Sequence, residues 1–345
     1  MSLLMLSLAG CERADPVYNS RFLAFGTLVD LSLVGLGKER AHQVSQAIEA
    51  DFQQMHEMWH AWDPGPLGRV NELCRTGERF AAPPSVLLLI KRGQQLSAQS
   101  GGRFNPAIGD LIAAWGFHRQ DPTEPMRPPP PERIAELVQR NPQMSDILLE
   151  DIYLQCRNPA VKLDFGAFGK GYGIDLAVRH LRELGVNNAI VKGGGDLRAI
   201  GSRSGTPWRI AIRRPSGAGV LGTLDVAGDE SVFTSGNYER TYQYEGRKVH
   251  HIIDPRTGYP AEGTASVTVL HSEGIVADAA ATALFIAGPE HWYEVAKAMG
   301  IGYVVLVDDQ GALHMNPEMQ ARLQLLDDDA PIRLSPPLRA PGDQR

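Results

Sequence analysis

Four segments of the chain carry residue types that could bind a phosphorylated ligand or a divalent cation. The first covers residues 164–172 and has the sequence DFGAFGKGY. The carboxylate of Asp164 ends a predicted strand, and alternate glycines let a ligand approach the backbone before a helix begins. The N–H groups and the dipole of a helix N-terminus favour phosphate, and Lys170 adds a full positive charge. Alternatively, the segment is only a tight connection between a strand and a helix.

The second segment, residues 192–196, has the sequence KGGGD and follows a predicted buried strand. Three consecutive glycines cost backbone entropy, which indicates that something there requires the absence of side chains. A run of backbone N–H groups around a pyrophosphate is one such requirement. A turn pressed against another part of the backbone is the other.

The third segment combines residues 234–238, TSGNY, with residues 250–258, HHIIDPRTG. The histidine pair offers a base that is neutral near physiological pH, and the Asp-Pro and Thr-Gly steps favour turns. A histidine on a strand can equally well be a structural residue. Catalysis by this pair therefore depends on what lies next to it.

The fourth segment covers residues 277–282, ADAAAT, within a predicted helix. Asp278 and Thr282 are four residues apart, so their oxygens share one helix face. The alanines around them allow another backbone to come close. Carboxylate, hydroxyl and carbonyl oxygens are hard ligands suited to Mg²⁺. Alternatively, Asp278 only caps or solvates a closely packed helix.

In this order, the four segments resemble the ApbE-type flavin transferases, which move FMN from FAD onto a protein hydroxyl. The resemblance extends from Phe25 to Thr282. It implies an α+β fold with a mixed or antiparallel strand-rich core, flanking helices, and FAD in a cleft between two closely packed lobes.

The resemblance also implies roles for individual residues. Mg²⁺ would be bound by the backbone carbonyl of Ala167 and by the side chains of Asp278 and Thr282, with Ala281 adjacent. His251 would activate the acceptor hydroxyl, which makes His251 and Asp278 the predicted catalytic residues. The residues expected to contact FAD are Phe25, Trp62, Arg103, Phe104, Asn105, Asp164, Lys170, Gly194, Gly195 and Ile252. Of these, Phe25, Trp62 and Asn105 differ from the residues that are commoner in the family.

The implied reaction uses FAD as substrate and Mg²⁺ as cofactor, and it releases AMP. By the same resemblance, the acceptor would be a threonine or serine of an exported subunit of a Na⁺-translocating quinone reductase or an Rnf-type complex. Three alternatives stay open at this point: an FAD pyrophosphatase that gives FMN and AMP, a non-enzymatic flavin-binding lipoprotein, and a solute-binding lipoprotein for another ligand.

Hydrophobic spacing predicts the elements that position these segments. Apolar residues at steps of three and four predict a long helix after Lys38 that ends at residues 63–66; they are Val44, Ile48, Phe52, Met55, Trp59 and Trp62. Further helices are expected over residues 85–100, 105–115, 132–140, 171–184, 275–287 and 290–299. Strands are expected over residues 26–34, 189–192, 208–212, 232–233, 242–244, 249–253, 267–269 and 302–307. Residues 147–156 and 161–165 are expected to form a hairpin, and residues 122–131 a proline-rich loop.

Composition excludes several classes of protein. Of the 345 residues, 43% are hydrophobic and 21% are charged, which is typical of a globular chain and argues against general disorder. The 34 Lys and Arg residues against 40 Asp and Glu give a net charge of −6. No general basic field attracts nucleic acid, so we expect no nucleic-acid partner.

The first residues have the form of a lipoprotein signal. Residues 1–10 are apolar and small, and Leu8-Ala9-Gly10-Cys11 resembles a lipobox. We expect a signal peptide over residues 1–10, a lipidated Cys11, and a location on the periplasmic side of a bacterial membrane. The flavin transferase domain would cover residues 20–325, followed by a disordered tail over residues 326–345. Alternatively, the start is a frayed apolar segment with a chance cysteine.

Two further cysteines, Cys74 and Cys156, lie far apart in the sequence. Neither is part of a CxxC motif or has a histidine at ligand spacing, so no zinc site is expected. Export would permit a disulfide between them. Two buried free thiols are the expected state.

Overall fold

A computed structural model describes residues 15–119, 126–326 and 330–338. Its described part contains a nine-stranded sheet in the order β1-β2-β6-β7-β10-β13-β14-β15-β17. Neighbouring strands are antiparallel, except that β15 and β17 are parallel. The strands are β1 (Val17–Ala24), β2 (Thr27–Val34), β6 (Ala189–Gly193), β7 (Asp196–Gly201), β10 (Gly228–Gly236), β13 (Thr264–His271), β14 (Tyr303–Asp308), β15 (Leu313–Met315) and β17 (Ile332–Leu334). The predicted α+β fold with a mixed, mainly antiparallel core is confirmed.

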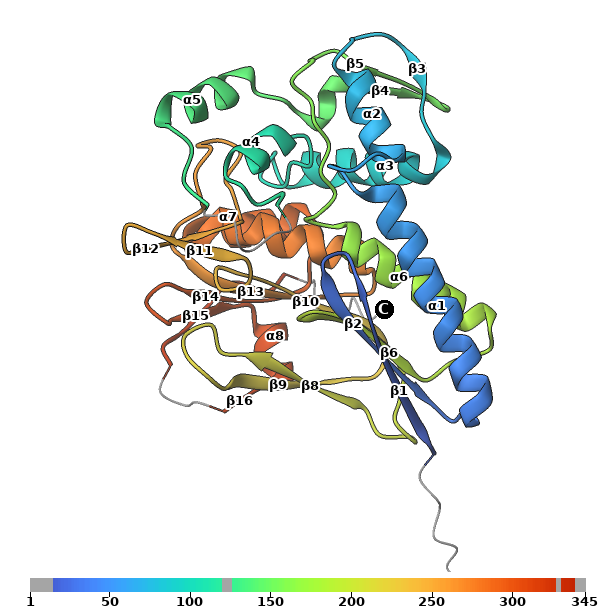
Figure 1. The fold of residues 1–345 in the computed structure, drawn as a ribbon. Coiled ribbons are helices and arrows are strands. Elements are labelled where there is room, and N and C mark those ends of the chain that lie inside the picture. The colour runs from blue at the N-terminus through green and yellow to red at the C-terminus, as the bar shows by residue number, and fades with distance from the viewer. Residues whose placement is uncertain (1–14, 120–125, 327–329, 339–345) are drawn as a thin grey trace, which may run out of the picture.

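Helices cover one face of this sheet, and a second small sheet covers the other (Figure 1). The helices are α1 (Lys38–Trp59), α6 (Gly169–Glu183) and α7 (Gly274–Ala298), and they share a large apolar core with the sheet. The small sheet has the order β16-β9-β8, formed by β16 (Leu323–Leu325), β9 (Val220–Val226) and β8 (Trp208–Arg213), with α8 (Pro317–Arg322) beside it. A second apolar core fills the space between the two sheets.

The remaining elements form a lobe above α7 in Figure 1. They are α2 (Pro66–Cys74), α3 (Pro84–Gln99), α4 (Gly109–Ala114), α5 (Pro131–Arg140), the 3₁₀ helix η1 (Met144–Asp146), and the strands β3 (Phe80–Ala81), β4 (Ile147–Glu150) and β5 (Tyr153–Cys156). The β11 (Thr241–Tyr244) and β12 (Arg247–His250) strands form a separate hairpin. Among the described residues, no helix combines the length and the apolar character needed to cross a membrane.

The apolar residues of α1 and α7 determine how much of each helix is buried. The predicted spacing on α1 is confirmed, because Val44, Ile48 and Phe52 all lie in the core. Trp62 follows the end of this helix. α7 is buried on nearly all sides, since small alanines let the sheet and α6 approach it. The predicted break between two helices there is a kink at Gly288, whose φ of 71° is not helical.

Several predicted elements differ from the structure. The hairpin lies within residues 147–156, as β4 and β5, and residues 161–165 contribute only an isolated bridge between Lys162 and Ile108. Three strands that were not predicted, β15, β16 and β17, follow the strand over residues 302–307. Within the tail predicted to be disordered, residues 332–334 form β17 and pair with β15. The predicted signal peptide, Cys11 and part of the proline-rich loop lie outside the described residues.

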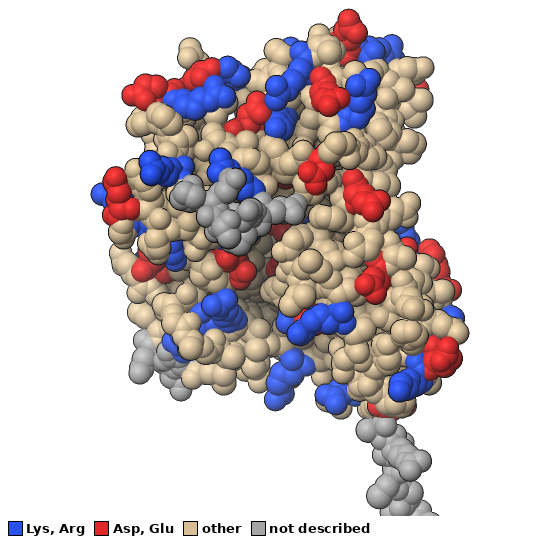
Figure 2. Space-filling view, viewed as in Figure 1, with Lys and Arg blue, Asp and Glu red and all other residues tan. Residues whose placement is uncertain are grey.

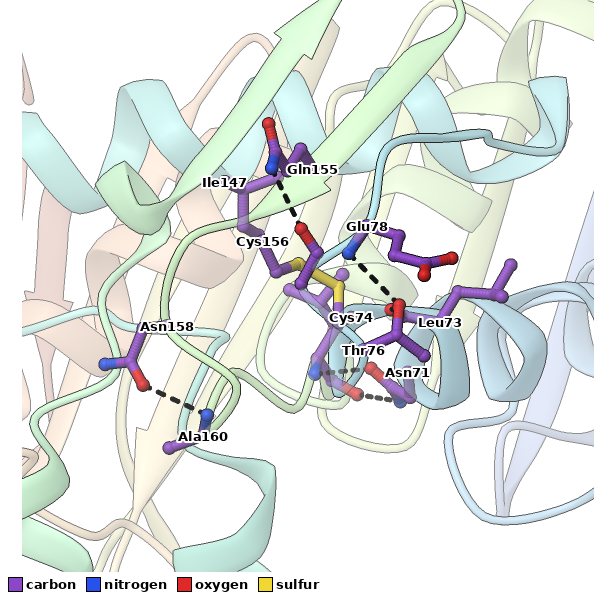
Figure 3. Close-up of a disulfide and its surroundings, with 12 residues drawn as sticks. Asn71, Leu73, Cys74, Thr76, Glu78, Ile147, Gln155, Cys156, Asn158 and Ala160 are labelled. Carbon is purple, nitrogen blue, oxygen red and sulfur yellow. Dashed lines mark hydrogen bonds between the residues drawn. A yellow bond between two sulfur atoms is a disulfide. The ribbon is translucent and has the colours of Figure 1, made fainter.

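The prediction of two free thiols was wrong. Cys74, the last residue of α2, forms a disulfide with Cys156 of β5, and their Cα atoms are 5.0 Å apart (Figure 3). Both residues are fully buried, as expected. The bond connects helix α2 to another three-stranded sheet, which has the order β3-β5-β4.

Candidate functional site

The site is built where α6 and α7 meet. Gly171 lies in the first turn of α6, and a Cβ there would be 2.9 Å from the Cβ of Asp278. A Cβ on Gly274, the first residue of α7, would be 2.8 Å from the carbonyl oxygen of Gly171. The two helices therefore touch backbone to backbone. This contact brings the buried carboxylate of Asp278 to the N-terminus of α6, where its Oδ2 accepts a 2.9 Å hydrogen bond from the Gly171 N–H.

Burial decides the charge state of Asp278. Loss of hydration raises the pKa of this carboxyl to about 7, although the positive charge of Lys170 opposes the shift. The hydroxyl of Thr282, one turn further along α7, lies 3.3 Å from the Ser235 hydroxyl of β10. Because Asp278 and Thr282 are four residues apart on α7, they share one helix face, and Ala281 is buried beside Thr282.

Lys170 lies in an ion pair with Asp196, the first residue of β7. The other oxygen of Asp196 accepts a 2.7 Å hydrogen bond from the backbone N–H of Thr234. Burial lowers the pKa of Lys170, but the negative charges of Asp196 and Asp278 outweigh it and keep the ammonium protonated. Asp196 closes the KGGGD segment and was not predicted as a site residue.

The three glycines form a tight connection between β6 and β7. Gly193 pairs with Asp196, so Gly194 and Gly195 are the two turn residues, and both are exposed. Gly194 has a φ of 63°, and its N–H donates to the carbonyl oxygen of Leu28 at 3.0 Å. A Cβ on Gly194 would be 3.0 Å from the Thr27 hydroxyl oxygen. The left-handed φ and the close Thr27 hydroxyl thus explain this glycine without any ligand.

Asp164 lies just before α6. Its Oδ1 accepts a 2.8 Å hydrogen bond from the Gly166 N–H, which turns the chain toward Ala167 and the first turn of α6. Burial raises the pKa of the Asp164 carboxyl. Ala167 immediately precedes Phe168, the N-cap residue of α6. Its carbonyl therefore belongs to the same end of the helix that Asp278 contacts.

The two neighbouring histidines have different environments. His250 is buried, and its Nε2 lies 2.9 Å from the Ala261 carbonyl oxygen, so it has a structural partner. In the described part of the chain, the buried Nδ1 of His251 has no hydrogen-bond partner. Burial and the positive charges of Arg240 and Lys170 lower the pKa of His251 to about 3. His251 is therefore a neutral imidazole at pH 7.

Two ring contacts, made by the neighbouring residues Phe117 and His118, connect His251 with Trp62. The ring of Phe117 lies 6.2 Å from that of His251, and the next residue, His118, lies 4.9 Å from the ring of Trp62. The ammonium of Lys162 is 4.0 Å from the centre of the Trp62 ring. Sequence reasoning missed Phe117, His118 and Lys162. Only an aromatic residue next to a histidine marked the first two, and this pattern is common in apolar segments.

Two other residues predicted to contact FAD interact with neighbouring residues of the protein. Phe104 is 1% exposed and packs edge-on against Phe168. Asn105 donates to the Pro142 carbonyl at 2.9 Å and accepts from the Ala107 N–H at 3.0 Å.

Three more residues predicted to contact FAD have partners of their own in the fold. Phe25 stacks on Trp59 with ring centres 5.9 Å apart. The backbone N–H of the buried Ile252 lies 3.3 Å from His250 Nδ1. Arg103 contacts the Ser100 carbonyl at 3.4 Å and carries a buried Nε without a partner among the described residues. Asp278, Thr282, Lys170, Asp164 and His251 remain the residues best placed to act on a ligand.

Figure 2 shows the face viewed in Figure 1 hollowed near its centre, with acidic atoms in the depth of the hollow. Basic and acidic side chains are mixed over the rest of this face. Within the described residues, no three His, Cys, Asp or Glu side chains gather as a metal site. The predicted metal ligands include only one carboxylate, so they would not form such a group.

Comparison with known proteins decides the family. The sequence profile of the ApbE family matches residues 25–305. The chain belongs to the ApbE family. A relative from Rhodobacter capsulatus, named FAD:protein FMN transferase, is 39% identical over 93% of this chain, which spans 61% of that relative. A Haemophilus influenzae protein of the same name is 27% identical, and the match covers 89% of this chain and 92% of that relative.

Solved ApbE structures share the fold of this family member. The ApbE protein from Thermotoga maritima has a TM-score of 0.81 at 29% identity and is covered over 99% of its chain, against 89% of this one. The flavin transferase ApbE from Vibrio cholerae has a TM-score of 0.76 at 26% identity and is covered over its full length, against 90% of this chain. The predicted family and fold are confirmed, and the predicted enzyme class, FAD:protein FMN transferase, is confirmed at the level of the family.

Proposed function

We propose that this ApbE family member transfers FMN from FAD to a serine or threonine hydroxyl of an acceptor protein and releases AMP. The observation that carries the proposal is the buried carboxylate of Asp278 at the N-terminus of α6, beside the positive charge of Lys170. A carboxylate for a cation and N–H groups for phosphate are the two requirements of phosphoryl transfer from a diphosphate. The names of the relatives support the same reaction.

The donor atoms around Asp278 fit a divalent cation such as Mg²⁺. The Ala167 carbonyl, the Asp278 carboxylate and the Thr282 hydroxyl are all hard oxygen ligands. Asp278 is buried, and Lys170, whose positive charge acts on it, is already paired with Asp196, so a divalent cation would add positive charge beside this carboxylate. When bound, Mg²⁺ neutralises charge on the diphosphate oxygens and makes AMP a better leaving group.

Residues of the chain would position the diphosphate and accept the proton of the acceptor hydroxyl. The positive charge of Lys170, in the first turn of α6, would attract the negative diphosphate. The acceptor oxygen forms a bond to the phosphorus of the FMN half, and the bond from that phosphorus to the oxygen of AMP breaks. The neutral imidazole of His251 takes the proton of the acceptor hydroxyl. A bound diphosphate would raise the pKa of His251 from its low value, because it offsets the charges of Arg240 and Lys170.

We further propose that the protein works on the periplasmic side of a bacterial membrane, anchored by lipid on Cys11. The lipobox-like sequence of residues 8–11 supports an anchor. The disulfide between Cys74 and Cys156 is typical of proteins in an oxidising compartment. The acceptor would then be exported, and a subunit of a Na⁺-translocating quinone reductase or an Rnf-type complex fits that description.

A hydrolase would use the same residues with water in place of the acceptor hydroxyl. FAD pyrophosphatase activity would release AMP and FMN without an acceptor. A flavin carrier would release neither. These alternatives differ in the product and not in the site, so the product must be measured.

The direct test is incubation of the protein with FAD, Mg²⁺ and a candidate acceptor peptide that contains serine or threonine. In-gel flavin fluorescence and intact mass follow the acceptor. We expect covalent fluorescence and a mass increase equal to FMN less water. FMN and AMP released at the same rate with and without acceptor would favour the hydrolase, and the absence of any AMP would favour the carrier.

A further inference from the structure

A buried asparagine of α2, Asn71, forms hydrogen bonds with the backbone of the residue before Asp164. The Oδ1 atom of Asn71 accepts a 2.7 Å hydrogen bond from the Leu163 N–H, and its Nδ2 donates to the Leu163 carbonyl oxygen at 2.9 Å. The side chain of Asn71 is buried. One side chain thus satisfies both backbone groups of the residue that precedes Asp164.

Residues 162–166 form no helix or strand. Apart from Asn71, their backbone is held by an isolated bridge between Lys162 and Ile108, in which the Gly109 N–H donates to the Lys162 carbonyl oxygen at 2.8 Å, and by two further hydrogen bonds. The backbone N–H groups of Lys162 and Asp164 donate to the carbonyls of Ala107 and Pro106 at 3.1 and 2.9 Å. These contacts hold one side of the segment, and Asn71 holds the other. Asn71 therefore contributes to the position of Asp164, whose carboxylate caps the turn to Ala167.

The disulfide fixes the helix that carries Asn71. Figure 3 shows Asn71 and Cys74 within the same turn of α2, and Cys74 is bonded to Cys156 of β5. α2 is only nine residues long, and short helices depend on tertiary contacts for their position. A covalent bond one turn from Asn71 limits how far this helix can shift.

We propose that Asn71 is a positioning residue for FAD binding and that the Cys74–Cys156 disulfide supports it by holding α2 in place. The inference rests on the proposed function, since it takes residues 164–167 to be part of the FAD site. Asn71 touches no reacting atom. Its loss would let Asp164 and Ala167 shift, which weakens FAD binding more than it slows the chemical step.

The test compares Asn71→Ala with Asn316→Ala. Asn316 is a matched control, because it is also buried and also accepts from one backbone N–H, that of Val304 at 3.0 Å, while donating to the Gly302 carbonyl at 2.8 Å. It immediately precedes α8, which lies on the far side of the large sheet from α2 in Figure 1. The dissociation constant of FAD is measured by flavin fluorescence, the KM for FAD and kcat by transfer assay, and Tm by thermal unfolding.

Both variants should lower Tm. We expect Asn71→Ala to raise the FAD dissociation constant and KM roughly tenfold with little change in kcat, and Asn316→Ala to leave all three unchanged. Asn71→Ser keeps a neutral polar group that can donate and accept, so it should show a smaller effect; it also carries the test if Asn71→Ala does not fold. An unchanged FAD dissociation constant in both Asn71 variants, with only Tm lowered, overturns the proposal.

A second arm replaces the disulfide. The double variant Cys74→Ser with Cys156→Ser should weaken FAD binding in the same direction, and adding Asn71→Ala should change it by less than the sum, because both act on one contact. Fully additive effects would overturn the link between the disulfide and Asn71. A wild-type protein that binds FAD but transfers no FMN refutes the proposed function alone, since the binding comparison still decides the role of Asn71. A wild-type protein that does not bind FAD overturns both.

Discussion

The Oδ2 atom of Asp278, on α7, accepts a 2.9 Å hydrogen bond from the backbone N–H of Gly171, on α6. The reverse contact is also present, because Asp175 of α6 accepts hydrogen bonds from Gly274 and Ile275 at the start of α7, at 2.7 and 2.9 Å. Each helix thus supplies a carboxylate to the N-terminus of the other, where free N–H groups and the helix dipole favour negative charge. This mutual capping fixes the position of Asp278 relative to the start of α6.

Replacing Asp278 tests the assigned metal ligand. Asp278→Ala should lower FMN transfer by about a thousandfold or more, because the charge that would bind the cation is lost. The rate is measured with FAD and Mg²⁺ at saturating concentrations. Asp225→Ala is a suitable control, since Asp225 forms a surface ion pair with Arg209 and should leave the rate unchanged. Near wild-type transfer by Asp278→Ala would refute the assignment.

Adding one methyl group where α6 and α7 touch should push the two helices apart and displace Asp278. In Gly171→Ala the new Cβ would lie 2.9 Å from the Cβ of Asp278 and also meet the Gly274 backbone. We expect a loss of about 1–3 kcal/mol in unfolding free energy, together with slower transfer. Gly37→Ala is the control, because a Cβ at Gly37 meets no atom within 4 Å. Equal stability of the two variants in denaturant titrations would contradict the proposed close contact.

The proposed base should matter less than the metal ligand. His251→Ala removes the proton acceptor, and we expect kcat to fall about a hundredfold, since positioning and charge neutralisation carry most of phosphoryl transfer. His42→Ala, at an exposed position, should have no effect. A larger loss of kcat for His251→Ala than for Asp278→Ala would reverse the order that we predict.

His251 should also make stability depend on pH. Its pKa falls from 6.5 to about 3 on folding, because burial and nearby positive charges disfavour the imidazolium. The unfolded chain therefore binds a proton between these values that the folded chain does not, and stability falls as the pH drops below 6.5. The decrease in Tm between pH 7 and pH 5 should be smaller in His251→Gln than in the wild type. An equal decrease in both proteins would show that His251 titrates normally.

Much of the fold could be predicted from local patterns. The spacing of Val44, Ile48 and Phe52 predicts α1 because one apolar face is enough to define a long helix. α2 was missed because it is short, begins at Pro66 and contains Gly68. The strand β17 was missed because it lies in a charged, proline-rich segment and pairs only with β15.

The site was predictable only in part. Asp278 and Thr282 are linked by helical spacing, so their shared face follows from the sequence. No local pattern predicts the pairing of Cys74 with Cys156 or of Lys170 with Asp196, since each joins residues that only the tertiary fold brings together. Phe104, which is expected to contact FAD, packs against Phe168, and no local pattern distinguishes an apolar residue of the core from one that binds a ligand.

The most direct test of the central claim counts AMP and covalently bound flavin in the same reaction, with FAD, an acceptor peptide and either Mg²⁺ or a chelator. We expect one AMP for each flavin attached to the acceptor, with both products lost on chelation and restored by added Mg²⁺. AMP formed without attached flavin, or transfer that continues after the divalent cation is removed, would contradict it.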